Sequence, residues 1–179
     1  MSRRALFLDR DGVINEDSGY VYRRPDFVFI DGIFDLVEAA HKAGYLSIVV
    51  TNQAGIGRGL YGEDDFRSLM EWVKAQFVQR GSTLDAVYFC PNHPIHGLGA
   101  YRLDCFDRKP RPGMILKAAR DHNIDLARSI LVGDKVTDME AAEAAGIQQR
   151  IFFSNDRDSG AASRVVRSLR QVIPLIDLQ

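Results

Sequence analysis

The sequence has few cysteines, no long apolar run and no excess of charge of either sign. Its 179 residues include two cysteines, Cys90 and Cys105, which are too few for the disulfide framework of a small secreted domain. No apolar stretch approaches the ~20 residues that span a bilayer. The net charge of −1 offers no electrostatic basis for binding nucleic acid or a membrane surface. We therefore expect a cytoplasmic protein with neither of these partners and, without an evident interface signal, a monomer.

Short apolar runs alternate with segments of helical periodicity. With 46% hydrophobic residues, a chain of this length predicts a single domain over residues 1–179. Consecutive apolar, branched residues predict buried parallel strands at 5–8, 46–50, 86–89, 129–132 and 150–153. Amphipathic patterns and end signals predict helices at 33–43, 63–79, 112–122, 138–145 and 161–172. This alternation predicts an α/β fold with a doubly wound parallel sheet flanked by helices.

Four polar clusters lie at the ends of these strands or of the loops that follow them. They are Asp9-Arg10-Asp11-Gly12, Thr51-Asn52-Gln53, Arg108-Lys109-Pro110 and Gly133-Asp134-Lys135. Two stretches without a regular pattern, 15–31 and 91–111, follow strands at the same edge of the sheet. Ligands bind at this edge in open α/β sheets, so we expect the clusters to converge on one site.

The residue types in these clusters suit phosphoryl transfer. Asp9, Asp11 and Asp134 would repel one another unless a hard cation such as Mg²⁺ neutralised them. An ionised Asp9 can attack phosphorus and form an acyl phosphate, while Asp11 exchanges protons with the leaving group and with water. Thr51 and Lys109 would stabilise the charge on the transferred phosphoryl group. The clusters therefore predict a magnesium-dependent phosphatase.

In this order, the four clusters resemble the four motifs of the haloacid dehalogenase (HAD) superfamily of phosphohydrolases. A closer resemblance is to the D-glycero-D-manno-heptose 1,7-bisphosphate phosphatases and covers nearly the whole chain. It rests on segments 8–15, 19–21, 51–59, 108–114 and 132–135, and on the pattern Phe27-x-Phe29-x-x-Gly32. The resemblance implies removal of the C7 phosphate of a heptose bisphosphate, which leaves heptose 1-phosphate for lipopolysaccharide and other cell-surface sugars.

The same resemblance implies roles for individual residues. Asp9 would be the nucleophile and Asp11 the general acid and base. Asp9, Asp134 and the backbone carbonyl of Asp11 would hold Mg²⁺. Residues implied to contact the sugar phosphate are Asp17, Ser18, Gly19, Tyr20, Thr51, Asn52, Gln53, Ala54, Arg108, Lys109 and Lys135.

The spacing between the motifs leaves no room for a separate cap domain. From Asp9 to Thr51 only a loop, one helix and one strand fit, and from Thr51 to Lys109 only one helix, one strand and one loop. We therefore expect an open site whose substrate choice depends on the two irregular loops. Asp138 is expected to be a helix cap or a partner that orients Lys135.

A structural zinc site that is usual in this family is degenerate here. Cys90 and Cys105 match two of its four ligand positions, and Asn92 and Asp107 occupy the other two. Asparagine is a poor zinc ligand, although His93 or His96 could substitute. We expect zinc binding to be weak or absent, with the two cysteines as buried thiols.

Two other functions compete with the heptose phosphatase interpretation. Histidinol-phosphate phosphatases share the motifs, although the segment 19–21 and Arg108 favour the heptose substrate. A phosphate-binding module without turnover would also preserve the fold. It would have no chemical need for the full set of Asp9, Asp11, Thr51, Lys109 and Asp134.

Overall fold

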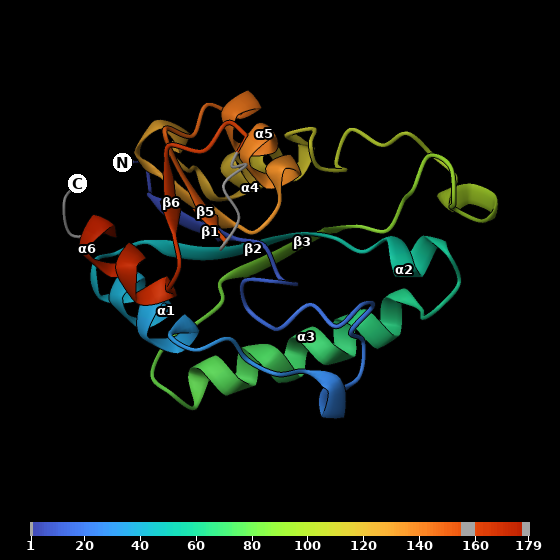
Figure 1. Cartoon of the computed structure of the whole chain (residues 1–179), viewed down its shortest axis with the longest axis horizontal. Coiled ribbons are helices and arrows are strands. Elements are labelled where there is room, and N and C mark those ends of the chain that lie inside the picture. The colour runs from blue at the N-terminus through green and yellow to red at the C-terminus, as the bar shows by residue number, and fades with distance from the viewer. Residues whose placement is uncertain (1, 155–159, 177–179) are drawn as a thin grey trace.

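Six parallel strands form one twisted sheet in the computed structural model, which describes residues 2–154 and 160–176 (Figure 1). The strand order is β3-β2-β1-β4-β5-β6. The strands are β1 (Ala5–Leu8), β2 (Leu46–Asn52), β3 (Ala86–Cys90), β4 (Ile130–Gly133), β5 (Gln149–Phe153) and β6 (Arg164–Val166). The predicted doubly wound α/β fold is confirmed.

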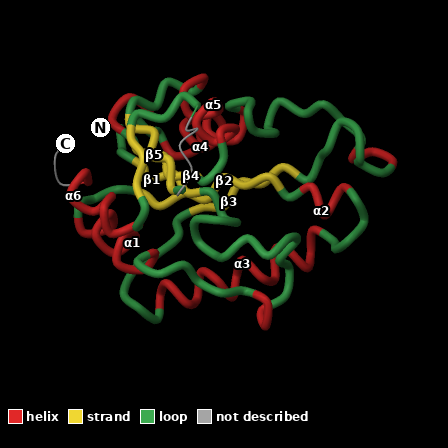
Figure 2. Tube along the Cα trace, in the orientation of Figure 1, coloured by secondary structure: helices red, strands yellow, loops and turns green. Residues whose placement is uncertain are grey.

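Helices cover both faces of the sheet, as Figures 1 and 2 show. One face carries α1 (Ile33–Lys42), α3 (Glu63–Val78) and α6 (Ile173–Ile176), and the other carries α4 (Gly113–His122) and α5 (Val136–Ala144). In β1, Leu6 and Leu8 face the first layer, whereas Ala5 and Phe7 face the second. This double burial explains why the strand is apolar at every position.

Short helical turns fill the loops between these elements. A one-turn helix, α2 (Ala54–Gly57), follows β2. In the described part of the chain, 3₁₀ helices cover Arg24–Asp26, Gly99–Tyr101, Leu126–Arg128 and Leu169–Val172. Only α1 and a 3₁₀ turn lie between β1 and β2, and only α2 and α3 lie between β2 and β3. Neither insertion forms a cap over the sheet edge.

The predicted helix at 161–172 is wrong. This segment forms the edge strand β6, in which Val166 pairs with Phe153 of β5, and then a 3₁₀ turn capped by Ser168. Helical spacing of apolar residues cannot reveal that an edge of β5 is available for pairing. The strand predicted at 46–50 extends two residues further, because Thr51 and Asn52 pair with Phe89 and Cys90.

The order in which strands are added to the sheet reverses at its centre, between β1 and β4. From β1 the chain builds towards β2 and β3 on one side, and later elements build from β4 towards β5 and β6 on the other. The crevice beyond the carboxyl ends of β1 and β4 is the usual ligand site of such a sheet. Asp9 directly follows β1 and Asp134 directly follows β4. Within the described residues, no helix has both the length and the apolarity to cross a membrane.

Candidate active site

Lys109 lies between two buried carboxylates at the end of the central strands. Its Nζ is 2.9 Å from Asp9 Oδ1 and 2.5 Å from Asp138 Oδ1, and it donates a 2.8 Å hydrogen bond to the backbone carbonyl of Val50. Asp9, Lys109 and Asp138 are at most 5% exposed. Burial alone would lower the pKa of Lys109, but Asp138 and Asp9 raise it above its usual value. The ammonium group is therefore charged and held beside Asp9.

Asn52 aligns the loop that carries Lys109 with strand β2. Its Nδ2 donates to the carbonyl of Lys109, and its Oδ1 accepts from the backbone N–H of Lys109, both at 3.1 Å. This pairing mimics a rung of a β-ladder between segments that lie far apart in the sequence. The side chain that was predicted to contact substrate therefore also fixes the position of Lys109.

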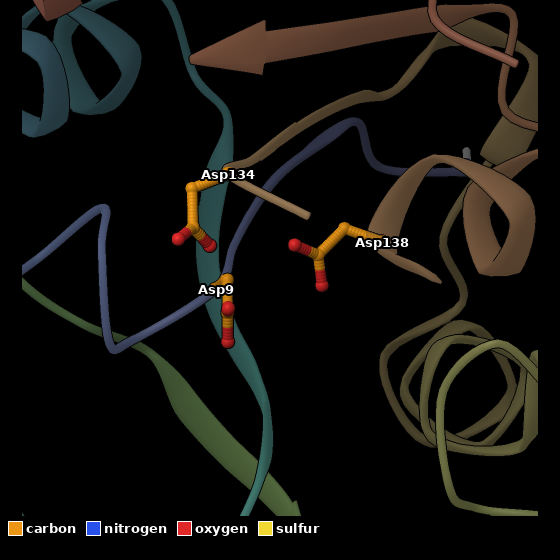
Figure 3. A group of neighbouring side chains, drawn as sticks. All are labelled: Asp9, Asp134 and Asp138. Atoms are coloured by element: carbon orange, nitrogen blue, oxygen red, sulfur yellow. The ribbon is translucent and has the colours of Figure 1, made fainter. Parts of the chain in front are cut away.

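Asp9, Asp134 and Asp138 point into a common space (Figure 3), with one carboxylate oxygen of each within 4.8 Å of the others. Asp138 is already paired with Lys109 and accepts from the backbone N–H of Lys135. Asp134 Oδ1, by contrast, is buried without a hydrogen-bond partner among the described residues. Burial and the neighbouring Asp9 raise the pKa of Asp134 to about 7. Oxygen donors and uncompensated negative charge fit a hard cation such as Mg²⁺.

Gly12 allows Asp134 to lie this close to the loop after β1. The glycine has a φ of +91°, and a Cβ at this position would be 2.1 Å from Asp134 Oδ2. Both the backbone conformation and the approach exclude a side chain there. The glycine in the Asp9-Arg10-Asp11-Gly12 cluster thus has a packing role in the site.

The raised pKa of Asp134 predicts that protons and a cation compete for this site. In the metal-free protein, the carboxyl binds a proton more tightly when folded, so its contribution to stability is lost as pH rises from about 3.8 to about 7. We expect Mg²⁺ to raise the melting temperature more at pH 8 than at pH 5. Thermal unfolding of wild type and Asp134→Asn, with Mg²⁺ or EDTA, measures this. An equal Mg²⁺ effect in both proteins would contradict it.

Asp11 lies beside the carboxylate cluster and turns its side chain elsewhere. It accepts hydrogen bonds from Arg10, Asn15 and Gln53, at 2.6 to 3.2 Å. Arg10 is completely buried, which is rare for arginine unless it is paired. The Asp11 side chain is thus held between the recess at the carboxylate cluster and a larger cleft, and it lines both.

A cleft of about 390 Å³ opens beside the carboxylate cluster. Its lining includes most of the predicted substrate residues: Asp17, Gly19, Tyr20, Asn52, Gln53, Ala54, Arg108, Lys109 and Lys135. Thr51 lines a small adjoining recess together with Asp9 and Asp138. Ser18 is exposed and does not line the cleft. The structure also places Tyr61 and Thr137 in the wall, which no motif indicated.

Lys135 has a different partner from the one the sequence indicated. Its Nζ is 3.0 Å from Asp17 Oδ2, so it connects the loop after β4 with the loop after β1. Asp138 contacts only the backbone N–H of Lys135 and directs its other oxygen to Lys109. The expected capping role of Asp138 is present, but the lysine side chain that it orients is Lys109. The Gly133–Asp138 spacing indicated Asp138, whereas its partner depends on the fold.

Cys90 and Cys105, at the start and towards the end of the second irregular loop, lie close together. Cys90 is buried, and burial raises the pKa of its thiol to about 12. The nearby Cys105 thiol also raises this pKa, whereas a hydrogen bond from the backbone of Asn92 lowers it. The Nδ1 of His93 accepts the backbone N–H groups of Ile95 and His96. Among the described residues, no third Cys, His, Asp or Glu ligand atom joins the two thiols.

We expect the purified protein to contain well below one zinc per chain. A thiol with a raised pKa is a poorer metal ligand, because zinc binds the thiolate. Elemental analysis after purification without added chelator measures the zinc content. A full equivalent of zinc would show that His93, His96 or Asp107 completes the site.

Two arginines without carboxylate partners lie in or beside the wall of the cleft. Neither Arg58 nor Arg108 forms an ion pair in the described part of the chain, and the Nε of Arg58 is buried without a hydrogen-bond partner. Arg108 lines the cleft, and the guanidinium of Arg58 lies 5.8 Å from the ring centre of Tyr20. Burial lowers the pKa of Arg108, and the charge of Arg58 acts in the same direction. Uncompensated positive charge of this kind suits an anionic ligand.

Comparisons with known proteins agree with this geometry. The family model described as HAD-hydrolase-like matches residues 106–166. A D-glycero-alpha-D-manno-heptose-1,7-bisphosphate 7-phosphatase from Burkholderia mallei is 56% identical over 98% of this chain and 95% of its own length. A D-glycero-beta-D-manno-heptose-1,7-bisphosphate 7-phosphatase from Vibrio cholerae is 46% identical over 96% and 95%.

A solved structure shows the same fold with ligands. It is a D,D-heptose 1,7-bisphosphate phosphatase from B. bronchiseptica complexed with magnesium and phosphate. Its TM-score is 0.81 at 27% identity, and the match covers 97% of each chain. Together with the sequence relatives, this likeness places the protein: it belongs to the D-glycero-D-manno-heptose-1,7-bisphosphate 7-phosphatase family of HAD-like hydrolases.

Proposed function

We propose that this phosphatase acts as a single-domain monomer and removes the C7 phosphate of D-glycero-D-manno-heptose 1,7-bisphosphate. The observation that carries the proposal is the buried Asp9–Lys109–Asp138 arrangement beside Asp134. This arrangement would supply a carboxylate nucleophile and a fixed ammonium in one small recess, with oxygen donors for a cation beside it. The names of the relatives supply the substrate.

The reaction proceeds in two steps on this chain. An oxygen of Asp9 forms a bond to phosphorus as the ester P–O bond breaks, and Asp11 gives a proton to the departing sugar oxygen. Water then attacks the phosphorus of the aspartyl phosphate while Asp11 takes a proton from it, and phosphate leaves with Asp9 restored. Lys109 and Thr51 stabilise the negative charge of the phosphoryl oxygens in both steps. A magnesium ion held by Asp9 and Asp134 would neutralise charge on the carboxylates and the phosphate.

Arg58 and Arg108 support a substrate with a second phosphate. Arg108 lines the cleft and Arg58 lies beside Tyr20 of its wall, and neither lines the recess that contains Asp9. A bisphosphate with one group at Asp9 can direct its other phosphate towards this positive region. A monophosphate would leave the two arginines without a counter-charge.

Replacing Arg108 with alanine should therefore reduce activity on the bisphosphate more than on a monophosphate. A lost charge-assisted hydrogen bond costs about 1.5–3 kcal/mol, so kcat/KM for the bisphosphate should fall roughly 10- to 100-fold. Heptose 7-phosphate, which lacks the second phosphate, should show only a small change. Equal losses on both substrates would contradict the assignment. Arg111→Ala, which removes an exposed ion pair with Asp104, is a matched control.

A substrate panel tests the function itself. Phosphate release with Mg²⁺ would be measured on both anomers of heptose 1,7-bisphosphate and on histidinol phosphate. We propose the α anomer as the preferred substrate, because identity is higher to the relative named for that anomer. A higher kcat/KM for histidinol phosphate would identify the sibling activity instead. Failure on every substrate would indicate a binding module.

A further inference from the structure

The side chain of Gln53 uses both of its N–H groups within the protein. Its Nε2 donates to Asp11 Oδ2 at 3.1 Å and to Thr51 Oγ1 at 2.9 Å. Its Oε1 accepts the hydroxyl of Tyr61 at 2.5 Å. Gln53 is only 2% exposed. Both of its N–H groups are used, so this amide has no donor left for a substrate, although its segment was predicted to contact one.

The two oxygens of Asp11 have unequal surroundings. Oδ1 accepts from Arg10 Nη2 at 2.6 Å, Arg10 Nε at 3.2 Å and Asn15 Nδ2 at 3.0 Å. Oδ2 accepts only from Gln53 among the described residues. Three donors, two of them from a cation, hold Oδ1 in place. Oδ2 is therefore the less occupied of the two oxygens, and Gln53 is the residue that holds it in position.

Tyr61 holds the other end of the Gln53 amide. The Asp11 carboxylate only accepts, so the NH₂ group faces it, and Oε1 on the opposite side accepts the Tyr61 hydroxyl. The reversed amide would set its oxygen against the carboxylate oxygen of Asp11 and lose that bond. Tyr61 is only 7% exposed and stacks on Tyr22, with ring centres 4.9 Å apart and planes at 6°. A Cβ at Gly55 would be 2.3 Å from Tyr61 Cε1, so this glycine makes room for the ring.

The same amide also directs the hydroxyl of Thr51. Because Thr51 Oγ1 accepts from Gln53, its own hydrogen is available for another acceptor. Thr51 lines the recess that contains Asp9 and Lys109, where a phosphoryl oxygen would lie. One side chain thus sets the geometry of a proton donor and of a phosphoryl-binding donor.

We propose that Gln53 and Tyr61 are positioning residues for the reaction: Tyr61 fixes the Gln53 amide, which aims Asp11 Oδ2 at the leaving-group oxygen. This inference rests on the proposed role of Asp11 as general acid. The step concerned is the attack of Asp9 on phosphorus, which breaks the P–O bond to the sugar. The electron pair of that bond goes to the sugar oxygen, which takes the proton from Asp11 Oδ2. Neither residue touches the substrate in this role.

Leaving-group dependence tests the proposal. A sugar phosphate needs a proton at its departing oxygen, whereas p-nitrophenolate leaves without one. For Tyr61→Phe, kcat/KM for the sugar phosphate should fall about 10-fold, since one hydrogen bond is worth about 1.4 kcal/mol in the transition state. For p-nitrophenyl phosphate it should change less than about 2-fold. The parameter kcat/KM reports only on the steps from substrate binding to departure of the leaving group, so later hydrolysis of the aspartyl phosphate does not affect it.

Gln53→Met provides a second variant, and Tyr88→Phe a matched control. Met keeps the length of the side chain and removes the amide. The ratio of kcat/KM for the sugar phosphate to kcat/KM for p-nitrophenyl phosphate should therefore fall further than in Tyr61→Phe. The Tyr88→Phe variant loses a hydroxyl that donates to Asp121 at 2.9 Å, outside the cleft. It should therefore keep the wild-type ratio. The ratio does not depend on the fraction of folded enzyme.

A wild-type ratio in both Tyr61→Phe and Gln53→Met would overturn the proposal, whether the two rates stay constant or fall together. The test needs any sugar phosphate that the wild-type enzyme hydrolyses. Failure of heptose bisphosphate as a substrate would therefore overturn the proposed function and leave this inference to be judged by the ratio.

Discussion

Asp9→Asn is expected to lower phosphate release by about 10⁴-fold or more, because the amide nitrogen and oxygen cannot replace a carboxylate nucleophile. The fold should be retained. Burial and the neighbouring Asp138 raise the pKa of Asp9, so its charge is disfavoured in the metal-free protein. Removing that charge relieves a cost, and the melting temperature without Mg²⁺ should not fall.

Three measurements check this prediction. Phosphate release gives the rate, thermal unfolding gives the stability, and rapid acid quenching with labelled substrate traps the aspartyl phosphate in wild type only. Asp121→Asn is a matched control, since this carboxylate is exposed and contacts Tyr88 and Arg120, away from the site. Labelled protein in Asp9→Asn, or substantial turnover, would exclude Asp9 as the nucleophile.

Lys109→Met is expected to cost both activity and stability. It leaves Asp9 and Asp138 buried without their cation, and breaking a buried ion pair in this way costs about 3–5 kcal/mol of unfolding free energy. Turnover should fall by about 10²-fold or more, because a fixed positive charge near the phosphoryl oxygens is lost. Saturating Mg²⁺ should recover part of the stability, since it compensates the same carboxylates.

Denaturant unfolding with and without Mg²⁺ measures the first effect, and kcat measures the second. Lys117→Met is a matched control on α4, where the lysine is exposed and its Nζ lies 6.0 Å from the ring centre of Tyr88. A Lys109→Met protein as stable as the control would show that the ion pairs contribute no net stability. Normal turnover in such a protein would remove Lys109 from the mechanism.

Local sequence determined most of the fold. Five runs of consecutive apolar residues specify the strands β1 to β5, because side chains on both faces of each strand pack against a helix layer. The edge strand β6 escaped prediction, because its three residues form a strand only by pairing with β5. Its place depends on an open sheet edge, which a local pattern does not contain.

The clusters that carry the chemistry could also be predicted, since parallel strands bring their carboxyl ends to one edge. Asp9, Thr51 and Asp134 meet there because β1, β2 and β4 are neighbours in the sheet, and the loop after β3 brings Lys109 to them. The arrangement of their partners was decided by tertiary structure alone. Lys109 between Asp9 and Asp138, and Tyr61 behind Gln53, join side chains from separate elements.

The physical reason is the range of the interactions. Burial and backbone propensity act on each segment by itself, so a sequence pattern records them. An ion pair or a hydrogen bond needs two groups within about 3 Å, and only the packed fold brings groups from distant segments that close. The sequence thus predicts which residues would react, and the tertiary structure decided which residues hold them in position.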